Sequence, residues 1–264
     1  MSKKIPFESK YKTARKFEYA ANLSLIISAS LIFILWLAPQ LPFPVEIRST
    51  LSPVKDLIKV CSYATMLSYM ALLLIGKFIF KSAEKAKRDD LIDNSFGTTF
   101  SDESSQGYYN NEDLDVGPVK LAVNAYESSF HTECTLRHML FKNSIKALMF
   151  SIPFLLSIFS ENGQSIVRLL FEISIPMITL IQLVTILGYY NSVKNLNDRF
   201  RSDLMGMDQK NINLSDQSKL LIPVMEYYNV KSWANINLDK DFFEKNREQL
   251  SKKWDIRKER LNIK

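Results

Sequence analysis

Cysteine is scarce in this chain of 264 residues, which contains only Cys61 and Cys134. Two cysteines provide no disulfide framework of the kind that stabilises small secreted domains. Cys61 also lies within a long apolar stretch, whereas Cys134 lies in a polar block. The cysteine content is therefore consistent with a reducing compartment.

The motifs of the common catalytic classes are also absent. The sequence contains no HExxH, no Walker phosphate loop, no GxSxG and no CxxC. Glu127, His131, Cys134 and His138 do recur at spacings of four, three and four, which on a helix brings them near one stripe. A single helix cannot wrap them round one ion, because the outer two would lie about 16 Å apart. We therefore expect no enzyme activity, no metal and no cofactor, and we interpret these residues as a packed polar seam.

Charged residues are missing from several long stretches. Residues 19–45 contain none, and the segment 20–38 is long enough to cross the roughly 30 Å hydrocarbon layer of a bilayer. A second candidate span covers 60–80, where Lys77 is close enough to one end for its ammonium to extend to the headgroups. A cleaved signal peptide is an alternative for the first stretch, because six basic residues precede it. That stretch, however, exceeds the usual core of roughly 7–15 residues, and prolines follow it.

Two further stretches are weaker candidates. In the third, only residues 147–160 are wholly uncharged, and a full crossing requires Lys142 and Lys146 to extend back to the interface. Taken alone, the third stretch could be a buried helix. The fourth runs from about 165 to 190, and a short turn joins it to the third. The pair is therefore predicted to form a transmembrane hairpin.

Basic residues flank these stretches unevenly. The N-terminal tail contains six and the chain after residue 190 contains fifteen, whereas the loop at 39–59 has three and the turn at 161–168 has one. The positive-inside rule therefore predicts that both termini and the central block are cytoplasmic. The expected parts are a cytoplasmic tail (1–18), two transmembrane helices (19–80), a cytoplasmic insert (81–143), two further transmembrane helices (144–190) and a cytoplasmic C-terminal region (191–264). The basic residues on the cytoplasmic side of the spans explain the net charge of +6, so duplex nucleic acid is not required as a partner.

The predicted fold class is an all-α membrane protein with four transmembrane helices and a mainly helical cytoplasmic region. A helix is expected from about 119 to 143, continuing into the third span, on the spacing of Leu121, Ala125, Phe130, Leu136, Leu140 and Phe141. The fourth span should continue inward until shortly before Gly206. Beyond it, Pro223 and residues 235–237 are expected to break the chain into short pieces. A last helix, about 239–262, carries Phe243, Leu250, Trp254 and Leu261 roughly in line.

Polar residues within the fourth span suggest two interpretations. Arg168 and Glu172 lie four residues apart near its outer end, either as an intrahelical ion pair or as part of an outer vestibule. Gln182 lies deeper in the same span. Four helices of one subunit bury too little polar surface for a water-filled channel, so a pore requires a homo-oligomer, and a tetramer is the expected state. In that assembly Glu172 and Gln182 are the candidate pore-lining residues.

Basic residues are absent between Asp89 and Asp115, a segment that contains eight acidic residues. An ordinary solvated loop has a similar composition, with turns expected at Gly97 and Gly107. Unlike an ordinary loop, this segment also concentrates side chains suited to ligand recognition: Asn94, Phe96, Thr98, Thr99, Tyr108, Tyr109, Asn110 and Asn111. Aromatic rings stack on the bases of nucleotides, and asparagine side chains form hydrogen bonds with the edges of those bases.

A polyanionic ligand of this segment would need positive charge from elsewhere in the chain. The candidates are Arg88, Arg199, Arg201, Lys252, Lys253 and Arg257. The predicted site therefore lies between the central segment and the C-terminal helix, with Tyr108 or Tyr109 stacked on a base.

The order of these elements resembles a known family. Basic residues, then DDLIDNSFGT, then GYYNN, all between two transmembrane pairs, resemble the SMODS-associating four-transmembrane effectors. These are membrane proteins encoded beside nucleotidyltransferases in bacterial antiphage systems. The likeness covers the plan of the whole chain, and its specific part runs from Arg88 to Glu112. The positions it singles out are Asp93, Asn94, Gly97, Tyr108, Tyr109 and Asn110.

This resemblance implies an effector in the bacterial inner membrane. Its membrane part would open or disrupt the bilayer when infection changes the level of a nucleotide or oligonucleotide made by the partner nucleotidyltransferase, with growth arrest or death of the infected cell. The resemblance leaves open whether the motif residues bind the ligand or hold the cytoplasmic region together. The alternative function is a non-conducting membrane anchor or scaffold that recruits a cytoplasmic partner.

Overall fold

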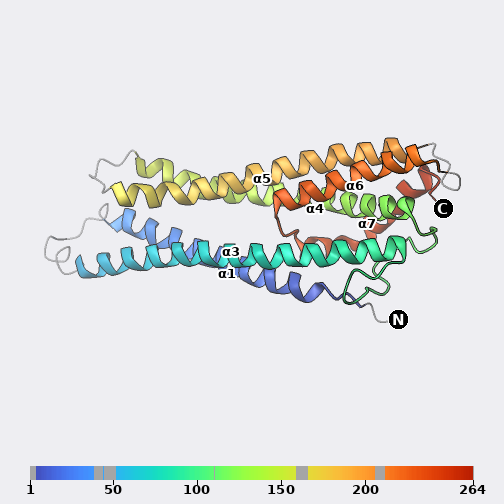
Figure 1. Cartoon of the computed structure of the whole chain (residues 1–264). Coiled ribbons are helices and arrows are strands. Elements are labelled where there is room, and N and C mark those ends of the chain that lie inside the picture. Colours follow the sequence, from blue (N-terminus) through green and yellow to red (C-terminus); the bar gives the residue numbers. More distant parts are fainter. Residues whose placement is uncertain are drawn as a thin grey trace. The chain divides into compact units, whose positions relative to one another are not determined.

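The structure, a computed structural model, describes residues 4–38, 44, 52–109, 111–158, 166–205 and 212–263. For residues 36, 153, 154, 156–158 and 166–172 it describes the backbone only. The described residues form six helices: α1 (Glu8–Leu37), α3 (Ser52–Phe96), α4 (Pro118–Ile158), α5 (Ile166–Leu204), α6 (Leu214–Ala234) and α7 (Lys240–Arg260) (Figure 1). No strand forms in this part of the chain, so the all-α prediction is confirmed for it.

Three of these helices are long and apolar enough to cross a membrane. They are found at Glu8–Leu35, Ser52–Phe96 and Ile173–Leu204, and only 17%, 17% and 28% of their apolar windows is buried. Apolar surface exposed over such lengths suits lipid better than water. The expected third span at 147–160 is not among them, and its last two residues lie outside the described part. The structure therefore supports a membrane protein with three apolar helices.

The chain divides into two compact units. Unit 1 comprises residues 1–12, 79–141 and 185–264, and unit 2 comprises residues 13–78 and 142–184. Helices α1, α3, α4 and α5 each contribute residues to both units. The apolar stretches that suggest membrane spans belong mainly to unit 2, whereas most of the polar sequence belongs to unit 1.

Unit 2 has a small core formed by Ala21, Leu25, Met66, Tyr69 and Ile175. Hydroxyl groups in its helices mostly bond to their own backbone. Thr65 and Ser68, for example, donate to the carbonyls four residues before them. Ser28 instead donates across to the Ser62 carbonyl at 3.1 Å, which links α1 to α3.

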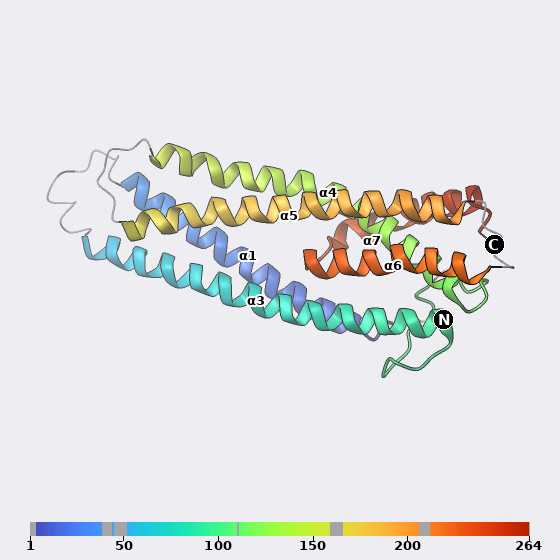
Figure 2. The same ribbon diagram turned by 45° about the horizontal axis from the view of Figure 1, so that its top comes forward.

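Unit 1 has an extensive aromatic core. Tyr126 of α4 stacks on Phe200 of α5 with ring centroids 5.4 Å apart, and Trp254 of α7 packs edge-on to Tyr126 at 5.2 Å. Tyr189 and Tyr227 are also fully buried. Helix α6 lies beside the C-terminal half of α5 in both views (Figures 1 and 2). Aromatic packing therefore joins α4, α5 and α7 around one core.

The predicted helices at 119–143 and 239–262 are confirmed as α4 and α7. Pro118 is the first residue of α4, where its missing N–H and fixed φ cost nothing. All six apolar positions whose spacing predicted this helix lie in α4, and most of them are buried, whereas Phe141 is 70% exposed. Phe141 is also the last α4 residue of unit 1.

The prediction that Pro223 breaks the chain was also wrong. Helix α6 runs continuously through Pro223, although proline cannot donate the usual backbone hydrogen bond. Pro223 is buried together with Leu220, Val224 and Tyr227, and this packing offsets the lost bond. The predicted break at 235–237 is confirmed, because Asn235 adopts the left-handed conformation (φ 46°) that ends α6.

Helix α3 extends further than the apolar stretch at 60–80. It continues through the charged residues 81–93 and ends at Phe96, followed by Gly97 with φ +68°. Glycine adopts this backbone conformation without strain, so Gly97 turns the chain away from the helix axis. The first eight residues of the acidic central segment, 89–96, are therefore helical.

Candidate functional site

Asp93 lies near the end of α3, thirteen residues beyond the apolar stretch, and is 6% exposed. Its Oδ1 accepts hydrogen bonds from Thr98 Oγ1 at 2.8 Å and from the Phe100 N–H at 2.7 Å. Its Oδ2 accepts hydrogen bonds from the Ser101 N–H at 2.7 Å and from the Ser101 hydroxyl. Burial raises the pKa of this carboxyl, but the hydrogen bonds from Ser101 and the Phe100 N–H outweigh it and lower the pKa to about 2. Asp93 therefore fastens the loop that follows Gly97.

Asp90 holds the next part of the same loop. It is 2% exposed, and its carboxylate accepts hydrogen bonds from both the N–H and the hydroxyl of Ser105 at 2.7 Å. The Tyr109 hydroxyl also donates to Asp90, at 3.1 Å. Together with burial of the ring, the negative charge of Asp90 raises the pKa of Tyr109. Two of the eight acidic residues are thus internal acceptors for the segment's own backbone and side chains.

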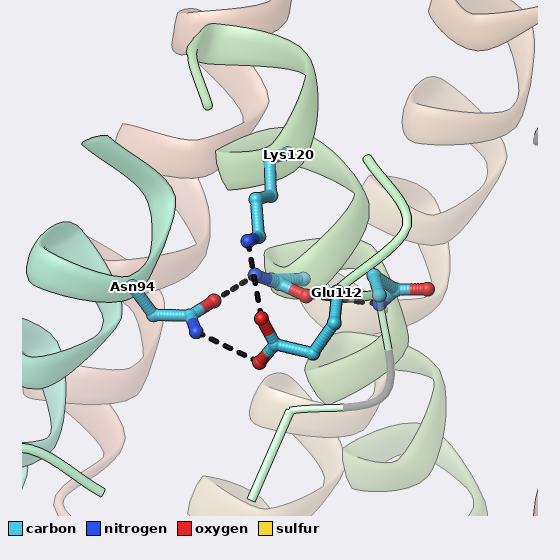
Figure 3. Close-up of polar contacts among 5 residues, drawn as sticks. Asn94, Glu112 and Lys120 are labelled. Carbon is cyan, nitrogen blue, oxygen red and sulfur yellow. Dashed lines mark hydrogen bonds and ion pairs between the residues drawn. The ribbon is translucent and has the colours of Figure 1, made fainter. Parts of the chain in front are cut away.

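A further set of polar contacts joins the end of the segment to α3 and α4 (Figure 3). Asn94 of α3 donates to Glu112 Oε1 at 3.1 Å, and Lys120 of α4 lies 3.4 Å from Glu112 Oε2. Asn94 also accepts a hydrogen bond from Asn124 Nδ2 at 3.1 Å. Asn94, one of the predicted ligand-binding residues, therefore uses both ends of its amide within the protein.

Asn111 extends this network into the core. It is fully buried, and its Nδ2 donates to Asn124 Oδ1 at 2.9 Å and to Glu127 Oε2 at 2.8 Å. Asn111 was singled out from the sequence as a recognition residue, but Asn124 and Glu127 were not assigned to this segment. The signal for them was weak, because a polar residue on an amphipathic helix usually faces solvent.

Tyr108 and Tyr109 lie together, with ring centroids 4.9 Å apart. Tyr108 also packs edge-on to Phe7 at 5.2 Å, and the Lys87 ammonium lies 5.6 Å from its ring centroid. Tyr109 packs against the core of unit 1. The structure thus pairs Tyr108 with Lys87, whereas the residue proposed from the sequence was its neighbour Arg88. Asn110 lies outside the described residues.

The basic residues proposed from the sequence do not converge on these tyrosines. Arg88 is exposed and lies 3.9 Å from Asp89, and Arg201, Lys252 and Lys253 are exposed. The Arg257 guanidinium lies over the Phe130 ring at 4.3 Å and donates to the Tyr126 hydroxyl at 3.2 Å. Arg257 therefore helps to hold α7 on α4.

Arg199 lines a pocket of about 410 Å³ between α5 and α6. The lining residues are Ser192, Asn195, Leu196, Arg199, Glu226, Asn229 and Val230. Arg199 Nη1 donates to Glu226 Oε1 at 2.7 Å, and Arg199 Nε lies 3.7 Å from Asp203. The pocket thus offers a guanidinium, a carboxylate, two amides and a hydroxyl.

The sequence did contain a signal for this pocket. Ser192, Asn195 and Arg199 recur at spacings of three and four, which places them on one face of α5. Val193, Leu196 and Phe200, which lie on the neighbouring face of the same helix, are all buried. Three polar residues in register beside a buried face therefore indicate a polar surface on this helix.

The residues of the proposed polar seam on α4 have separate surroundings, and Cys134 packs against the core of unit 1. Glu127 binds Asn111, His131 packs between Phe130 and Phe243, and His138 stacks on Phe242 at 4.3 Å. Burial and the nearby Lys87 charge lower the pKa of His131 to about 4. His131 is therefore neutral at physiological pH and acts as part of the packing.

Gln182, in the apolar stretch of α5, lies near Lys146 of α4. Lys146 Nζ donates to Asn22 Oδ1 at 2.6 Å and to Gln182 Oε1 at 3.5 Å, which links α4 to α1 and α5 within unit 2. The side chains of Arg168 and Glu172 lie outside the described residues. Gln182 as a pore-lining residue stays a prediction, as does Glu172.

Comparison of this chain with protein-family models, curated proteins and solved structures finds no match.

Proposed function

We propose that this protein is a multi-pass effector of the bacterial inner membrane, with four spans and cytoplasmic termini, that assembles as a homo-oligomeric pore. A nucleotide or oligonucleotide signal, bound by the cytoplasmic helical region, controls that pore. The proposed role is the antiphage one that the resemblance to the SMODS-associating effectors implies.

The main support for this proposal is the continuity of α5. This one continuous helix contains an apolar stretch long enough to cross a membrane, and its C-terminal half forms one wall of the pocket. Gln182 precedes Ser192 by ten residues, or about 15 Å along the helix. A ligand that moves the pocket wall would therefore act on the same continuous helix that carries a candidate pore residue.

The chemistry of the pocket supports a ligand with phosphate and hydrogen-bonding groups. A volume of about 410 Å³ falls within the usual range for small-molecule sites. Arg199 offers a planar guanidinium for phosphate, and the amides of Asn195 and Asn229 can read the edge of a base. Glu226 forms an ion pair with Arg199, so a phosphate must compete with this carboxylate for the guanidinium.

The contacts of the central segment support its role in holding the cytoplasmic region together. Asp90, Asp93 and Asn94 are each engaged by hydrogen bonds within the protein. On this proposal the segment braces α3 against α4, and Arg199 is the residue of the predicted site that meets the ligand. Stacking of Tyr108 or Tyr109 on a base remains a separate prediction.

Binding of nucleotides to purified full-length protein tests the site. The probes are a set of linear and cyclic mono-, di- and trinucleotides. For the one that binds best, Arg199→Ala should weaken binding about tenfold or more, because a hydrogen bond to a charged group is worth about 1.5–3 kcal/mol. Arg201→Ala, an exposed arginine two residues away on α5, is the matched control and should bind as the parent does.

Glu226→Gln provides a test in the opposite direction. It preserves the shape of the pocket while removing the carboxylate that competes for Arg199, so an anionic ligand should bind more tightly. Equal effects of Arg199→Ala and Arg201→Ala, or no binding of any probe by the parent protein, would exclude this pocket as the nucleotide site.

A further inference from the structure

Trp233, near the end of α6, is 63% exposed although it is a large aromatic residue. Its ring lies directly against Gly188 of α5, where a Cβ would come within 3.2 Å of the ring atom Cη2. A side chain at position 188 would therefore displace the indole. One face of Trp233 covers α5, and the remainder is open to the surroundings.

The contacts between α5 and α6 show which end of α6 this is. Arg199 pairs with Glu226, and Gly188 lies under Trp233, so α6 runs antiparallel to α5. Gly188 belongs to the uncharged stretch 173–193, and the first charged residue after it is Lys194. Six residues correspond to about 9 Å along a helix. Trp233 is thus level with the end of the apolar stretch of a helix that is long enough to cross a membrane.

Cationic side chains occur at the same end of unit 1. Two residues before Trp233, Lys231 forms a buried ion pair with Glu84 at 2.6 Å, and Tyr11 bonds to the same carboxylate. Lys12 follows Tyr11, and Lys81 precedes Glu84 by three residues, and both lysines are exposed. These contacts place an exposed tryptophan and exposed lysines at one level of unit 1, near the end of an apolar helix. That combination of residues is typical of a membrane–water interface.

We propose that the C-terminal end of α6 binds the cytoplasmic headgroup layer of the membrane. Trp233 enters the interface beside α5, and Lys12 and Lys81 attract anionic lipid headgroups. Helix α6 contains no apolar stretch long enough to span a bilayer, so this contact is with the membrane surface. The proposal requires α5 to be inserted in a bilayer, but it requires neither a pore nor a nucleotide.

The test uses full-length protein in vesicles of phosphatidylcholine and phosphatidylglycerol, and compares the parent with Trp233→Phe. The difference between the two emission spectra is the signal of Trp233, because Trp36 and Trp254 are present in both. In vesicles whose acyl chains carry bromine close to the headgroup, this difference signal should lose roughly half of its intensity, since tryptophan prefers the interfacial depth. Bromine near the chain ends should quench it less, and aqueous iodide should quench it little.

Three results would overturn the proposal. Strong quenching by iodide with none by brominated lipid means that Trp233 faces water. Quenching by neither agent means that protein, such as a second copy of this chain, covers it. Failure of both proteins to float with the vesicles would refute membrane insertion, and with it the proposed function. Flotation without quenching by brominated lipid would refute the contact of Trp233 with the membrane, but not the insertion of the protein.

Discussion

Asp93 occupies an unfavourable position for a carboxylate. It lies in the last turn of α3, where the unpaired carbonyl groups of a helix repel negative charge. Hydrogen bonds from Thr98, Phe100 and Ser101 offset this repulsion and bind the loop to the helix end. The acidity of the central segment is therefore partly structural.

Replacing Asp93 by Asn should destabilise the folded protein. The amide cannot accept all of these bonds, because one of its two polar atoms is a donor. Loss of hydrogen bonds to a charged acceptor predicts a cost of about 1.5–3 kcal/mol. The measurement is thermal unfolding of purified protein in detergent, with Asp102→Asn, at an exposed position of the same loop, as the control. If both variants unfold at the same temperature, Asp93 does not fasten the loop.

His131 should make stability depend on pH. The pKa of its side chain is about 4 in the folded protein, against about 6.5 in an unfolded chain, so the unfolded state takes up a proton first as the pH falls. The contribution of neutral His131 is therefore complete above pH 6.5 and is lost progressively towards pH 4. At pH 5 the loss should be about 2 kcal/mol.

The matched pair His131→Leu and His138→Gln isolates this effect. These are the two histidines of the chain, and His138 is partly exposed and stacks on Phe242. Between pH 7 and pH 5 the temperature of thermal unfolding should fall less for His131→Leu than for the parent. For His138→Gln it should fall as much as for the parent. An equal fall in all three proteins would assign the pH dependence to other groups.

At the scale of elements, α7 depends on a few residues. Its buried residues are Leu250 and Trp254, and Arg257 adds its contact with Phe130. Near the start of the helix, Phe243 packs on His131 and Phe242 stacks on His138. Trp254 is the large, fully buried side chain that anchors the C-terminal half of α7.

Trp254→Ala should release α7 from the core. Truncating a buried tryptophan costs about 3–5 kcal/mol, so limited proteolysis should cleave the C-terminal region much faster than in the parent. Ile256→Ala, at a position that is 50% exposed, is the control on the same helix and should cost less than about 0.5 kcal/mol. Equal protection of the two variants would mean that α7 is held by other contacts.

The elements that could be predicted from the sequence are those with a clear helical spacing of apolar residues. Helices α4 and α7, and the continuation of α5 through Val193, Leu196 and Phe200, had this signal. Helix α6 did not, because Pro223 suggests a break unless its burial is known. The charged end of α3 was hidden for another reason: eight acidic residues resemble a solvated loop until Asp90 and Asp93 are seen to accept internal hydrogen bonds.

The candidate site was predictable only in part, because residues from distant segments form it. Arg199 was proposed from its charge, but Glu226 and Asn229 reach the pocket only through the antiparallel packing of α6 on α5. Lys87 lies over Tyr108 because α3 remains helical well beyond its apolar stretch. Sequence alone gives no information on which of several basic residues will meet a given ring.

At the scale of the whole molecule, the distribution of apolar sequence supports a membrane protein. Three helices are apolar over lengths that suit a bilayer, and their apolar surfaces are mostly open. Most of the polar sequence is gathered in one unit, which has a core of its own. Helix α5 contributes residues to both units, and on the proposed function it is the element through which the pocket would act on the membrane part.

Ion flux from vesicles tests the central claim most directly. Full-length protein is reconstituted into potassium-loaded vesicles, and release is followed with and without the nucleotide that binds best. We predict a flux that changes on addition of this nucleotide in the parent and in Arg201→Ala, but not in Arg199→Ala. Inserted, oligomeric protein that releases no potassium under either condition would contradict a pore and indicate a non-conducting scaffold. A flux that ignores the nucleotide would contradict its control by the pocket.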